Sequence, residues 1–436
     1  MIVENFFIRA FDKARRGDYQ GAILDYTQAL QVNPGDAKAF NNRGYAHFML
    51  GDYERAIQDY TSALQIDPRF GEAYYNRGIA RFMVGDYEGA IADYTQAIQL
   101  RPHDPKAHGN RGFAHLMLKN YTQAIADYTA ALALQPEDAK SYYNRGVAYL
   151  GLEQYAAALA DLNQALQYNP EFAEAYNKRG SAYFELGQIQ EALRDYNEAI
   201  RLNPTLAEAY YNRGVAYGEL GQVQREIEDY TEAIRFNPDF AEAYYNRGIA
   251  RFMIGDKEGA LADYTKAIQL NPDDARGYSN RGFAYHSLNR LQEAIADYTK
   301  ALELDPNLAE VYSKRGNARF DLGDVAGAIE DYTEAIRINP DYAVAYYNRA
   351  TARFDLGDVL GEIEDYNRTL RLDPNFADAY LNRGLARLRL GNKREALADF
   401  RKAASLFEHR GDQAMYQQIM ELIQKVAAKP EGTSMK

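Results

Sequence analysis

Residues 74–83 read YYNRGIARFM, and the same ten residues recur at 244–253. The two copies are 170 residues apart (244 − 74 = 170), which is five times 34. A fixed internal period of 34 residues is typical of proteins that stack helical repeats along one continuous core. The rest of the 436-residue chain follows the same period.

Proline marks this period most clearly. Eleven of the 13 prolines lie at intervals of 34, at residues 34, 68, 102, 136, 170, 204, 238, 272, 306, 340 and 374. Because proline ends a helix, each of these positions predicts a loop. A glycine turn such as GDY at 51–53 lies between successive prolines, and apolar residues recur at helical steps around it. Each repeat is therefore predicted as helix, tight turn, helix and proline loop, which makes the chain all-α.

The period also sets the predicted domain organisation. Twelve 34-residue repeats should fill residues 3–410, with starts at 3, 37, 71, 105, 139, 173, 207, 241, 275, 309, 343 and 377. We number the repeats 1–12 and the positions in each repeat 1–34. Residues 411–427 carry an apolar face and are predicted to form a helix that caps the last repeat. Residues 428–436 are expected to be a flexible tail.

The repeats share a consensus: aromatic at position 4, Gly at 8, Ala at 20, aromatic at 24, Ala at 27 and Pro at 32. In repeat 2 these residues are Phe40, Gly44, Ala56, Tyr60, Ala63 and Pro68. The pattern resembles the tetratricopeptide repeat (TPR), in the style of long bacterial and cyanobacterial arrays. This resemblance implies an α-solenoid, a right-handed superhelix of about twelve helix-turn-helix units plus the C-terminal capping helix. It also implies a concave groove lined by the first helix of each repeat.

The composition and the absence of certain motifs limit the functions that the chain can have. The net charge is −12 and the basic residues do not cluster, which argues against nucleic-acid binding. The chain has no cysteine, so disulfides and zinc-thiolate sites are excluded. No apolar run approaches the roughly 20 residues of a membrane span, and the N-terminus lacks a signal-peptide core, so we expect a cytoplasmic protein. Because nucleophile, phosphate-loop and metal motifs are missing, we predict no enzymatic activity, no cofactor and no metal.

Two charged positions depart from the usual apolar pattern of the family. Position 7 is Arg and position 23 is Asp in all twelve repeats, from Arg9 and Asp25 to Arg383 and Asp399. Both positions fall on helix faces that should point into the packed layer, where an unpaired charge is costly. We therefore predict a ladder of Arg–Asp pairs, within a repeat or between neighbours, with a structural role.

Position 6 is the main candidate for binding in the groove that the resemblance implies. From repeat 2 onward it reads Asn42, Asn76, Asn110, Asn144, Lys178, Asn212, Asn246, Asn280, Lys314, Asn348 and Asn382. An asparagine amide both donates and accepts hydrogen bonds, so a row of them can match the backbone of an extended peptide. The row resembles the asparagine ladder with which a member of the family holds peptide backbones. The alternative is that the row bonds neighbouring helices and solvent.

Other groove candidates are aromatic or flexible. They are Tyr75, Tyr143, Tyr211, Tyr245 and Tyr347 at position 5, and Phe82, Met83, Phe252 and Met253 at positions 12 and 13. Exposed Phe and Met suit an adaptable apolar peptide, whereas packing between helices is the alternative for them.

These patterns predict a protein-protein interaction scaffold that binds an extended peptide or protein segment, for complex assembly or recruitment. The alternatives are a structural or self-associating element and a regulatory subunit of a separately encoded enzyme. The outward positions of the second helices are polar, as at Gln58 and Glu232, which favours a monomer.

Overall fold

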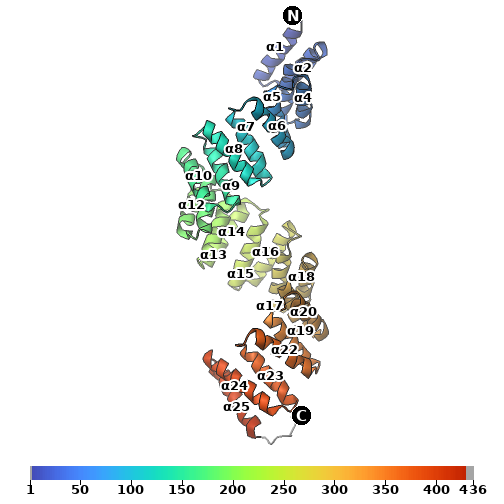
Figure 1. Cartoon of the computed structure of the whole chain (residues 1–436), viewed down its shortest axis with the longest axis vertical. Helices are drawn as coiled ribbons and strands as arrows, with labels where there is room; N and C mark the ends of the chain where they lie inside the picture. Colours follow the sequence, from blue (N-terminus) through green and yellow to red (C-terminus); the bar gives the residue numbers. More distant parts are fainter. Residues whose placement is uncertain (1, 429–436) are drawn as a thin grey trace. The chain divides into compact units, whose positions relative to one another are not determined.

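The computed structural model describes residues 2–428, which form helices joined by short turns and loops and contain no strand (Figure 1). The prediction of an all-α repeat fold is confirmed. The first helices of the repeats are α1 (Ile2–Arg15), α3 (Ala37–Met49), α5 (Gly71–Met83), α7 (Pro105–Met117), α9 (Ala139–Gly151), α11 (Ala173–Glu185), α13 (Ala207–Glu219), α15 (Ala241–Met253), α17 (Ala275–Ser287), α19 (Ala309–Asp321), α21 (Ala343–Asp355) and α23 (Ala377–Arg389).

The second helices alternate with them along the chain. They are α2 (Tyr19–Val32), α4 (Tyr53–Ile66), α6 (Tyr87–Leu100), α8 (Tyr121–Leu134), α10 (Tyr155–Tyr168), α12 (Ile189–Leu202), α14 (Val223–Phe236), α16 (Lys257–Leu270), α18 (Leu291–Leu304), α20 (Val325–Ile338), α22 (Val359–Leu372) and α24 (Lys393–His409). A last helix, α25 (Gln413–Ala428), follows α24. None of these helices is long and apolar enough to cross a membrane.

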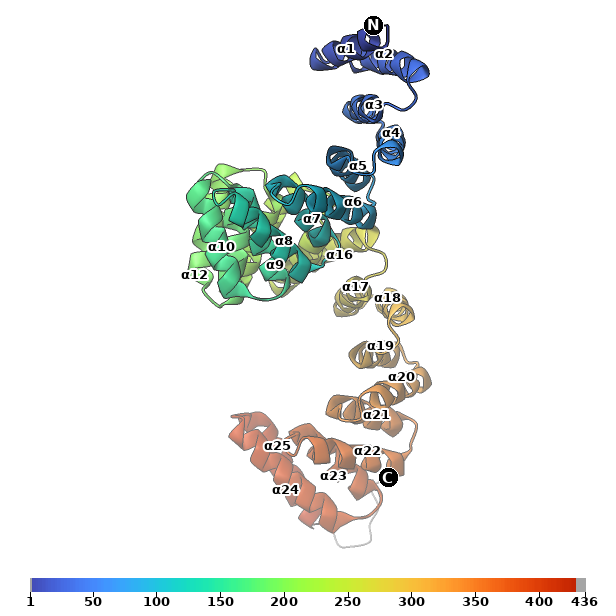
Figure 2. The same ribbon diagram turned by 45° about the horizontal axis from the view of Figure 1, so that its top comes forward.

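The chain divides into two compact halves, Met1–Leu220 and Gly221–Lys436. In each half, consecutive helices form hairpins, and each hairpin packs on the next one along the chain. Figure 2 shows α3–α6 of the first half and α17–α20 of the second nearly end-on, with first helices in one layer and second helices in the other. The first helices of successive repeats therefore lie side by side within each half.

The tight turn of each hairpin has a clear chemical basis. Asp86 caps α6 by accepting a hydrogen bond from the backbone N–H of Gly89 at 2.9 Å. Gly85 precedes it with φ +82°, a left-handed conformation that costs side-chain-bearing residues about 1–2 kcal/mol. Lys119 and Asn289 hold the same turn position with φ near +58° (57° and 59°), so the hairpin geometry overrides the local preference.

Small and aromatic residues alternate in the core for a steric reason. Tyr94 is buried on α6, and its ring lies against Gly78 of α5 so closely that a Cβ there would be 2.7 Å from a ring carbon. The alanines at positions 10, 20 and 27, such as Ala80, Ala90 and Ala97, are also buried. The Gly–Tyr contact lets the two helices of a hairpin approach each other, which explains why the consensus keeps these two positions together.

The predicted Arg–Asp ladder is confirmed. In repeat 3, Arg77 donates from Nε and Nη2 to the carboxylate of Asp93 at 2.9 and 2.7 Å, and from Nη1 to Oγ1 of Thr61 in the preceding repeat at 3.0 Å. Equivalent pairs are Arg43–Asp59, Arg111–Asp127, Arg145–Asp161, Arg179–Asp195, Arg247–Asp263, Arg281–Asp297, Arg315–Asp331, Arg349–Asp365 and Arg383–Asp399. Each arginine thus closes its own hairpin and also bonds the hairpin before it.

The predicted capping helix is also present. Ile419 and Val426 of α25 are buried against Phe400 and Phe407 of α24, so α25 covers the apolar face at the end of the last repeat. The flexible tail predicted for 428–436 lies outside the described residues, apart from Ala428 at the end of α25.

Candidate functional site

The asparagines of position 6 bond the neighbouring first helix. Asn76 donates from Nδ2 to Oδ1 of Asn41 at 3.2 Å, and Asn212 to Oδ1 of Asn177 at 3.0 Å. The acceptor is position 5 of the preceding repeat in both cases. The row therefore contributes to the stacking of hairpins, as the alternative interpretation of the sequence held.

The same bond forms where position 5 of the preceding repeat is tyrosine. The pairs are Asn110–Tyr75 at 3.1 Å, Asn280–Tyr245 at 2.9 Å and Asn382–Tyr347 at 3.1 Å, each from Nδ2 to the hydroxyl. Asn348 reaches Oδ1 of Asn317 instead, at 3.0 Å. All of these asparagines are half-buried. A half-buried amide that donates one such bond retains a second N–H and a carbonyl oxygen with which it can meet a ligand.

The other members of the row are placed on the same helix face. Asn42 of α3 accepts a hydrogen bond from Asn41 at 3.3 Å. Asn144 on α9, Asn246 on α15 and Tyr211 on α13 are half-buried.

The two lysines that interrupt the row are engaged within the chain. Lys178 donates to Oε1 of Glu208 at 2.5 Å, and the ammonium of Lys314 lies 5.7 Å from the ring centroid of Phe283. Lys178 therefore already holds a carboxylate of the next repeat.

Positions 12 and 13 have different environments. The ring centroid of Phe82 lies 5.3 Å from that of Phe113 and 5.1 Å from that of Tyr87, and Phe252 lies 5.3 Å from Phe283. These phenylalanines pack between neighbouring helices. Met83 and Met253, by contrast, are 50% and 69% exposed, so position 13 remains open to a ligand.

Four of the predicted groove residues meet at one pocket in the first half of the chain. Tyr75 of α5, Asn110 of α7, and Tyr143 and Asn144 of α9 line a cavity of about 730 Å³ together with residues of α8 and the adjoining loops. This volume falls in the range of ligand pockets, roughly 300–1,000 Å³. Phe113 and Phe172 add aromatic surface to its wall.

The cavity lies beside a glycine at position 5. Position 5 is Tyr75 in repeat 3 and Tyr143 in repeat 5, but it is Gly109 in repeat 4, and a Cβ built on Gly109 meets nothing within 4 Å. Repeats 3, 8 and 11 place the position-5 tyrosine ring 6.0, 6.1 and 5.7 Å from the position-24 tyrosine ring of the same repeat. Repeat 4 lacks that ring and has open space at Gly109, although Tyr128 itself stays 1% exposed. Sequence reasoning missed Gly109, which the list of position-5 tyrosines passes over.

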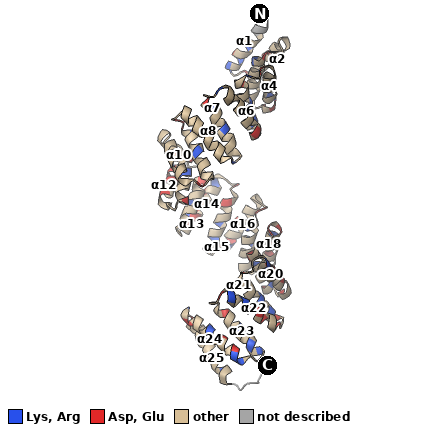
Figure 3. Ribbon diagram, in the orientation of Figure 1, with Lys and Arg blue, Asp and Glu red and all other residues tan. Residues whose placement is uncertain are grey.

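The polar groups of the pocket are neutral hydrogen-bonding groups, two cations and one carboxylate, Asp138. Burial raises the pKa of Tyr143 to about 12 and also raises the pKa of Tyr75, so both hydroxyls stay protonated at neutral pH. Lys106 and Lys140 line the same pocket, and neither forms an ion pair with another described residue. Figure 3 shows Lys and Arg interleaved with Asp and Glu along the described helices, so such a basic rim is a local feature of an acidic chain.

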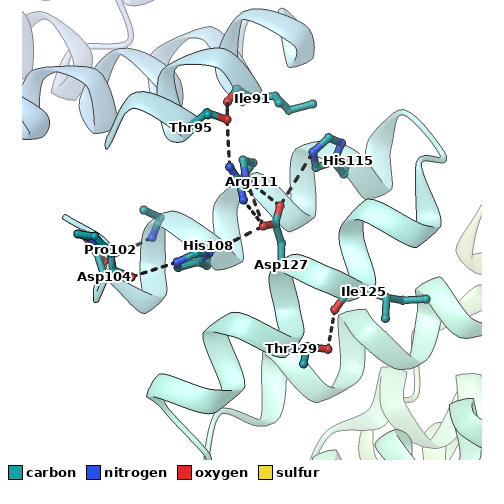
Figure 4. Close-up of polar contacts among 11 residues, drawn as sticks. Ile91, Thr95, Pro102, Asp104, His108, Arg111, His115, Ile125, Asp127 and Thr129 are labelled. Carbon is teal, nitrogen blue, oxygen red and sulfur yellow. Dashed lines mark hydrogen bonds and ion pairs between the residues drawn. The ribbon is translucent and has the colours of Figure 1, made fainter. Parts of the chain in front are cut away.

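A second polar cluster surrounds Asp127 of α8 (Figure 4). Arg111 contacts the carboxylate at 2.6 Å, while Nδ1 of His108 and Nε2 of His115 lie 3.8 and 4.0 Å from it. Burial is the main cause that lowers the pKa of His115. The cluster is one Arg–Asp pair of the ladder with two histidines beside it. The described residues contain no group of three or more His, Asp or Glu arranged to hold a metal ion.

The repeats match known family models over most of the chain. The model described as TPR repeat matches residues 13–51, 151–187, 180–221, 284–323, 316–357 and 361–391. Models described as tetratricopeptide repeat match residues 37–70, 71–104, 105–138 and 241–274, then 128–160 and 263–296, and finally 207–240 and 377–409. Together these matches cover residues 13–357 and 361–409. The chain therefore belongs to the tetratricopeptide repeat family.

Solved structures resemble the chain more weakly. The APC/C hetero-tetramer Cut9-Hcn1 gives a TM-score of 0.46 at 15% identity, over 97% of this chain and 96% of that one. Yeast Tom70 gives 0.39 at 16% identity, over 98% and 96%, and MamA protein gives 0.38 at 24% identity, over 39% and 94%. Similarity at this level carries no functional argument. No curated protein sequence matches the chain.

Proposed function

We propose that this protein is a non-enzymatic scaffold whose first helices bind an extended segment of a partner protein, for complex assembly or recruitment. The observation that carries this proposal is the pocket of repeats 3–5, where position 5 and position 6 residues of three successive first helices converge on one cavity. A ligand in that cavity would contact α5, α7 and α9 together, which is the geometry of a segment that runs across the repeats.

The energetics favour a segment with a few anchors. The remaining N–H and carbonyl groups of Asn110 and Asn144 can bond a peptide backbone irrespective of its side chains. Exposed apolar groups, such as Phe113 in the pocket lining and Met83 at the end of α5, can bury side chains of the ligand. A short segment that gains a few hydrogen bonds and one or two buried side chains typically binds with a Kd of about 1–100 μM, because ordering the peptide costs much of the gross energy.

The experiment is selection of peptides from a random displayed library with the full chain, followed by affinity measurement on variants. Asn110→Ala removes an amide that we propose to meet the peptide, but it also removes the hydrogen bond to Tyr75. Tyr75→Phe removes that same hydrogen bond and leaves the amide in place. The matched pair therefore separates ligand contact from helix stacking.

We expect selected peptides to lose about tenfold in affinity with Asn110→Ala and much less with Tyr75→Phe. Equal losses in the two variants would assign the asparagine row to stacking alone. A library that yields no specific binder of the folded chain would contradict the proposed function itself.

A further inference from the structure

The pocket of repeats 3–5 has open space at Gly109, where repeats 3, 8 and 11 carry a tyrosine side chain. In those three repeats the position-5 ring lies 5.7–6.1 Å from the position-24 tyrosine ring. In repeat 4 the open space is lined by the aromatic rings of Tyr75, Phe113 and Tyr143. Aromatic pairs gain about 0.5–1.5 kcal/mol beyond the area that they bury, so this space is suited to a planar ring.

The hydroxyl of Tyr128 lies behind the pocket lining. Tyr128 is 1% exposed, and no described residue reaches hydrogen-bonding geometry with its Oη. The hydroxyl of Tyr332, at the same position of repeat 10, donates to Asn317 at 2.8 Å. Because the oxygen of Tyr128 is buried, the ligand is recognised by the side chains that are open to the pocket, which are Tyr75, Phe113 and Tyr143.

The rim adds charge selectivity. Lys106 and Lys140 lie at the pocket, whereas the one acidic residue in its lining, Asp138, is engaged as a helix cap by the N–H of Lys140 at 3.2 Å and by Oγ of Ser141 at 2.6 Å. Two cations without a partner among the described residues, in a chain of net charge −12, favour an anionic group near the ring of the ligand.

We infer that the pocket at Gly109 takes an aromatic side chain of the bound segment, with a carboxylate beside it that Lys106 and Lys140 hold. This inference rests on the proposed function and specifies its ligand. The aromatic ring occupies the open space beside Gly109 and packs against Tyr75, Phe113 and Tyr143. The segment is therefore anchored at repeat 4 and continues over α5 and α9 through its backbone.

Repeat 9 offers an internal comparison for this inference. It also lacks the tyrosine, with Ser279 at position 5, and the hydroxyl of Tyr298 also has no partner among the described residues. However, its position-2 cation, Arg276, lies 5.2 Å over the ring of Tyr245 and pairs with Asp274 at 2.7 Å. Lys106 makes no such contact, so the cation of repeat 4 is available to a ligand and that of repeat 9 is engaged.

The test is a pair of substitutions at one position. Gly109→Tyr restores the side chain of the other repeats and fills the pocket, whereas Gly109→Ala adds one methyl group and leaves the pocket open. Both replace a helical glycine, so both should fold at least as well as the parent. The probe is 4-hydroxyphenylacetate, which carries a ring, a hydroxyl and a carboxylate, and its binding to the full chain is followed by ligand-observed NMR.

We expect the probe to bind the parent and Gly109→Ala, and to lose at least about tenfold in affinity with Gly109→Tyr. Replacing Lys106 and Lys140 by Gln should weaken this probe about three- to tenfold and leave the neutral 4-hydroxyphenylacetamide nearly unchanged. Equal binding to the Tyr and Ala variants would overturn the inference, because the ring would then bind elsewhere.

Peptide selection distinguishes this inference from the proposed function. Binders that are enriched in an aromatic residue next to Asp or Glu, and that are lost with Gly109→Tyr, support both. Binders without that enrichment, unaffected by Gly109→Tyr, contradict the aromatic anchor and leave the scaffold proposal standing. If 4-hydroxyphenylacetate binds at Gly109 but no peptide does, the pocket is supported and the scaffold proposal fails.

Discussion

Repeats 3–4 (71–138) and repeats 8–9 (241–308) are near copies, and their buried framework is the same. Arg111 contacts Asp127 at 2.6 Å and bonds Thr95 at 3.1 Å; Arg281 contacts Asp297 at 2.7 Å and bonds Thr265 at 3.2 Å. These groups form one connected network across two hairpins, so a change in one of them leaves the others without a hydrogen-bond partner. This coupling explains why the framework stays the same in the two blocks.

The positions around the candidate groove differ between the two blocks. Repeat 4 has Lys106, Gly109 and His115 where repeat 9 has Arg276, Ser279 and Tyr285. His115 borders the network, since its Nε2 lies 4.0 Å from Asp127, but Lys106 and Gly109 lie outside it and can change alone. The comparison indicates that stability is set by the layer between the helices; under the proposed function, recognition would be set by single substitutions on the first helices.

The largest expected effect tests whether the framework is equivalent in both blocks. Arg111→Ala and Arg281→Ala each leave a buried aspartate without its main partner, which costs about 3–5 kcal/mol. Because stability in a repeat array is local, each substitution should melt its own half of the chain first. Amide hydrogen exchange of α7–α8 and of α17–α18 measures this directly, with the unchanged block in each variant as the internal control.

The double variant Arg111→Ala/Asp127→Ala provides the coupling control. It removes both charges, so it should lose less stability than the sum of the two single variants. Simple additivity would mean that the two side chains act independently and that the ladder is not a set of pairs.

The next effect separates two kinds of glycine. Gly78 and Gly248 lie at position 8 of repeats 3 and 8, and a Cβ added to either would be 2.7 Å from a carbon of a tyrosine ring. Substitution of either glycine by Ala should therefore lower the stability by about 1–3 kcal/mol through overpacking. Gly109, at position 5, faces open space, and Ala there should stabilise α7 by up to about 1 kcal/mol. Thermal melts followed by circular dichroism compare the three variants, and a loss of stability in Gly109→Ala would show that its space is needed for packing.

Sequence reasoning predicted the repeated buried framework well, but it missed a residue that departs from the repeat. The period of proline and glycine determines the hairpins, and the repeated Arg and Asp indicated the ladder, because buried constraints recur in every repeat. The hydrogen bond from Arg77 to Thr61 of the preceding repeat could not be predicted from the sequence, because helix periodicity does not specify how neighbouring hairpins are aligned. Gly109 was missed for the opposite reason: its importance lies in a departure from the repeat, and a consensus averages such departures away.

A smaller effect concerns the asparagine row. Asn110→Ala and Asn280→Ala should each destabilise their own half by about 0.5–1.5 kcal/mol, because each removes one hydrogen bond to a tyrosine of the preceding first helix. Tyr75→Phe and Tyr245→Phe remove the same bonds from the other side. Chemical denaturation that gives the Asn and Tyr variants equal losses within each block would establish that these bonds stabilise both blocks alike.

The smallest effect is a pH dependence confined to the block with histidine at position 11. His115 of α7 faces Asp127 of α8, together with Arg111 and His108 on its own helix, and its pKa is lowered below the ordinary 6.5, mainly by burial. The unfolded chain therefore binds a proton more readily than the folded one. The stability linked to His115 is complete above about pH 6.5 and declines as the pH falls below that value.

Hydrogen exchange of α7–α8, corrected for intrinsic rates, should show weaker protection at pH 5 than at pH 7, while α15–α16, which contain no histidine, serve as the reference. His115→Tyr, which introduces the residue of repeat 9, should reduce this difference. If the difference persists unchanged in that variant, the proton is taken up by another group, and the two blocks do not differ in the way that their position-11 residues predict.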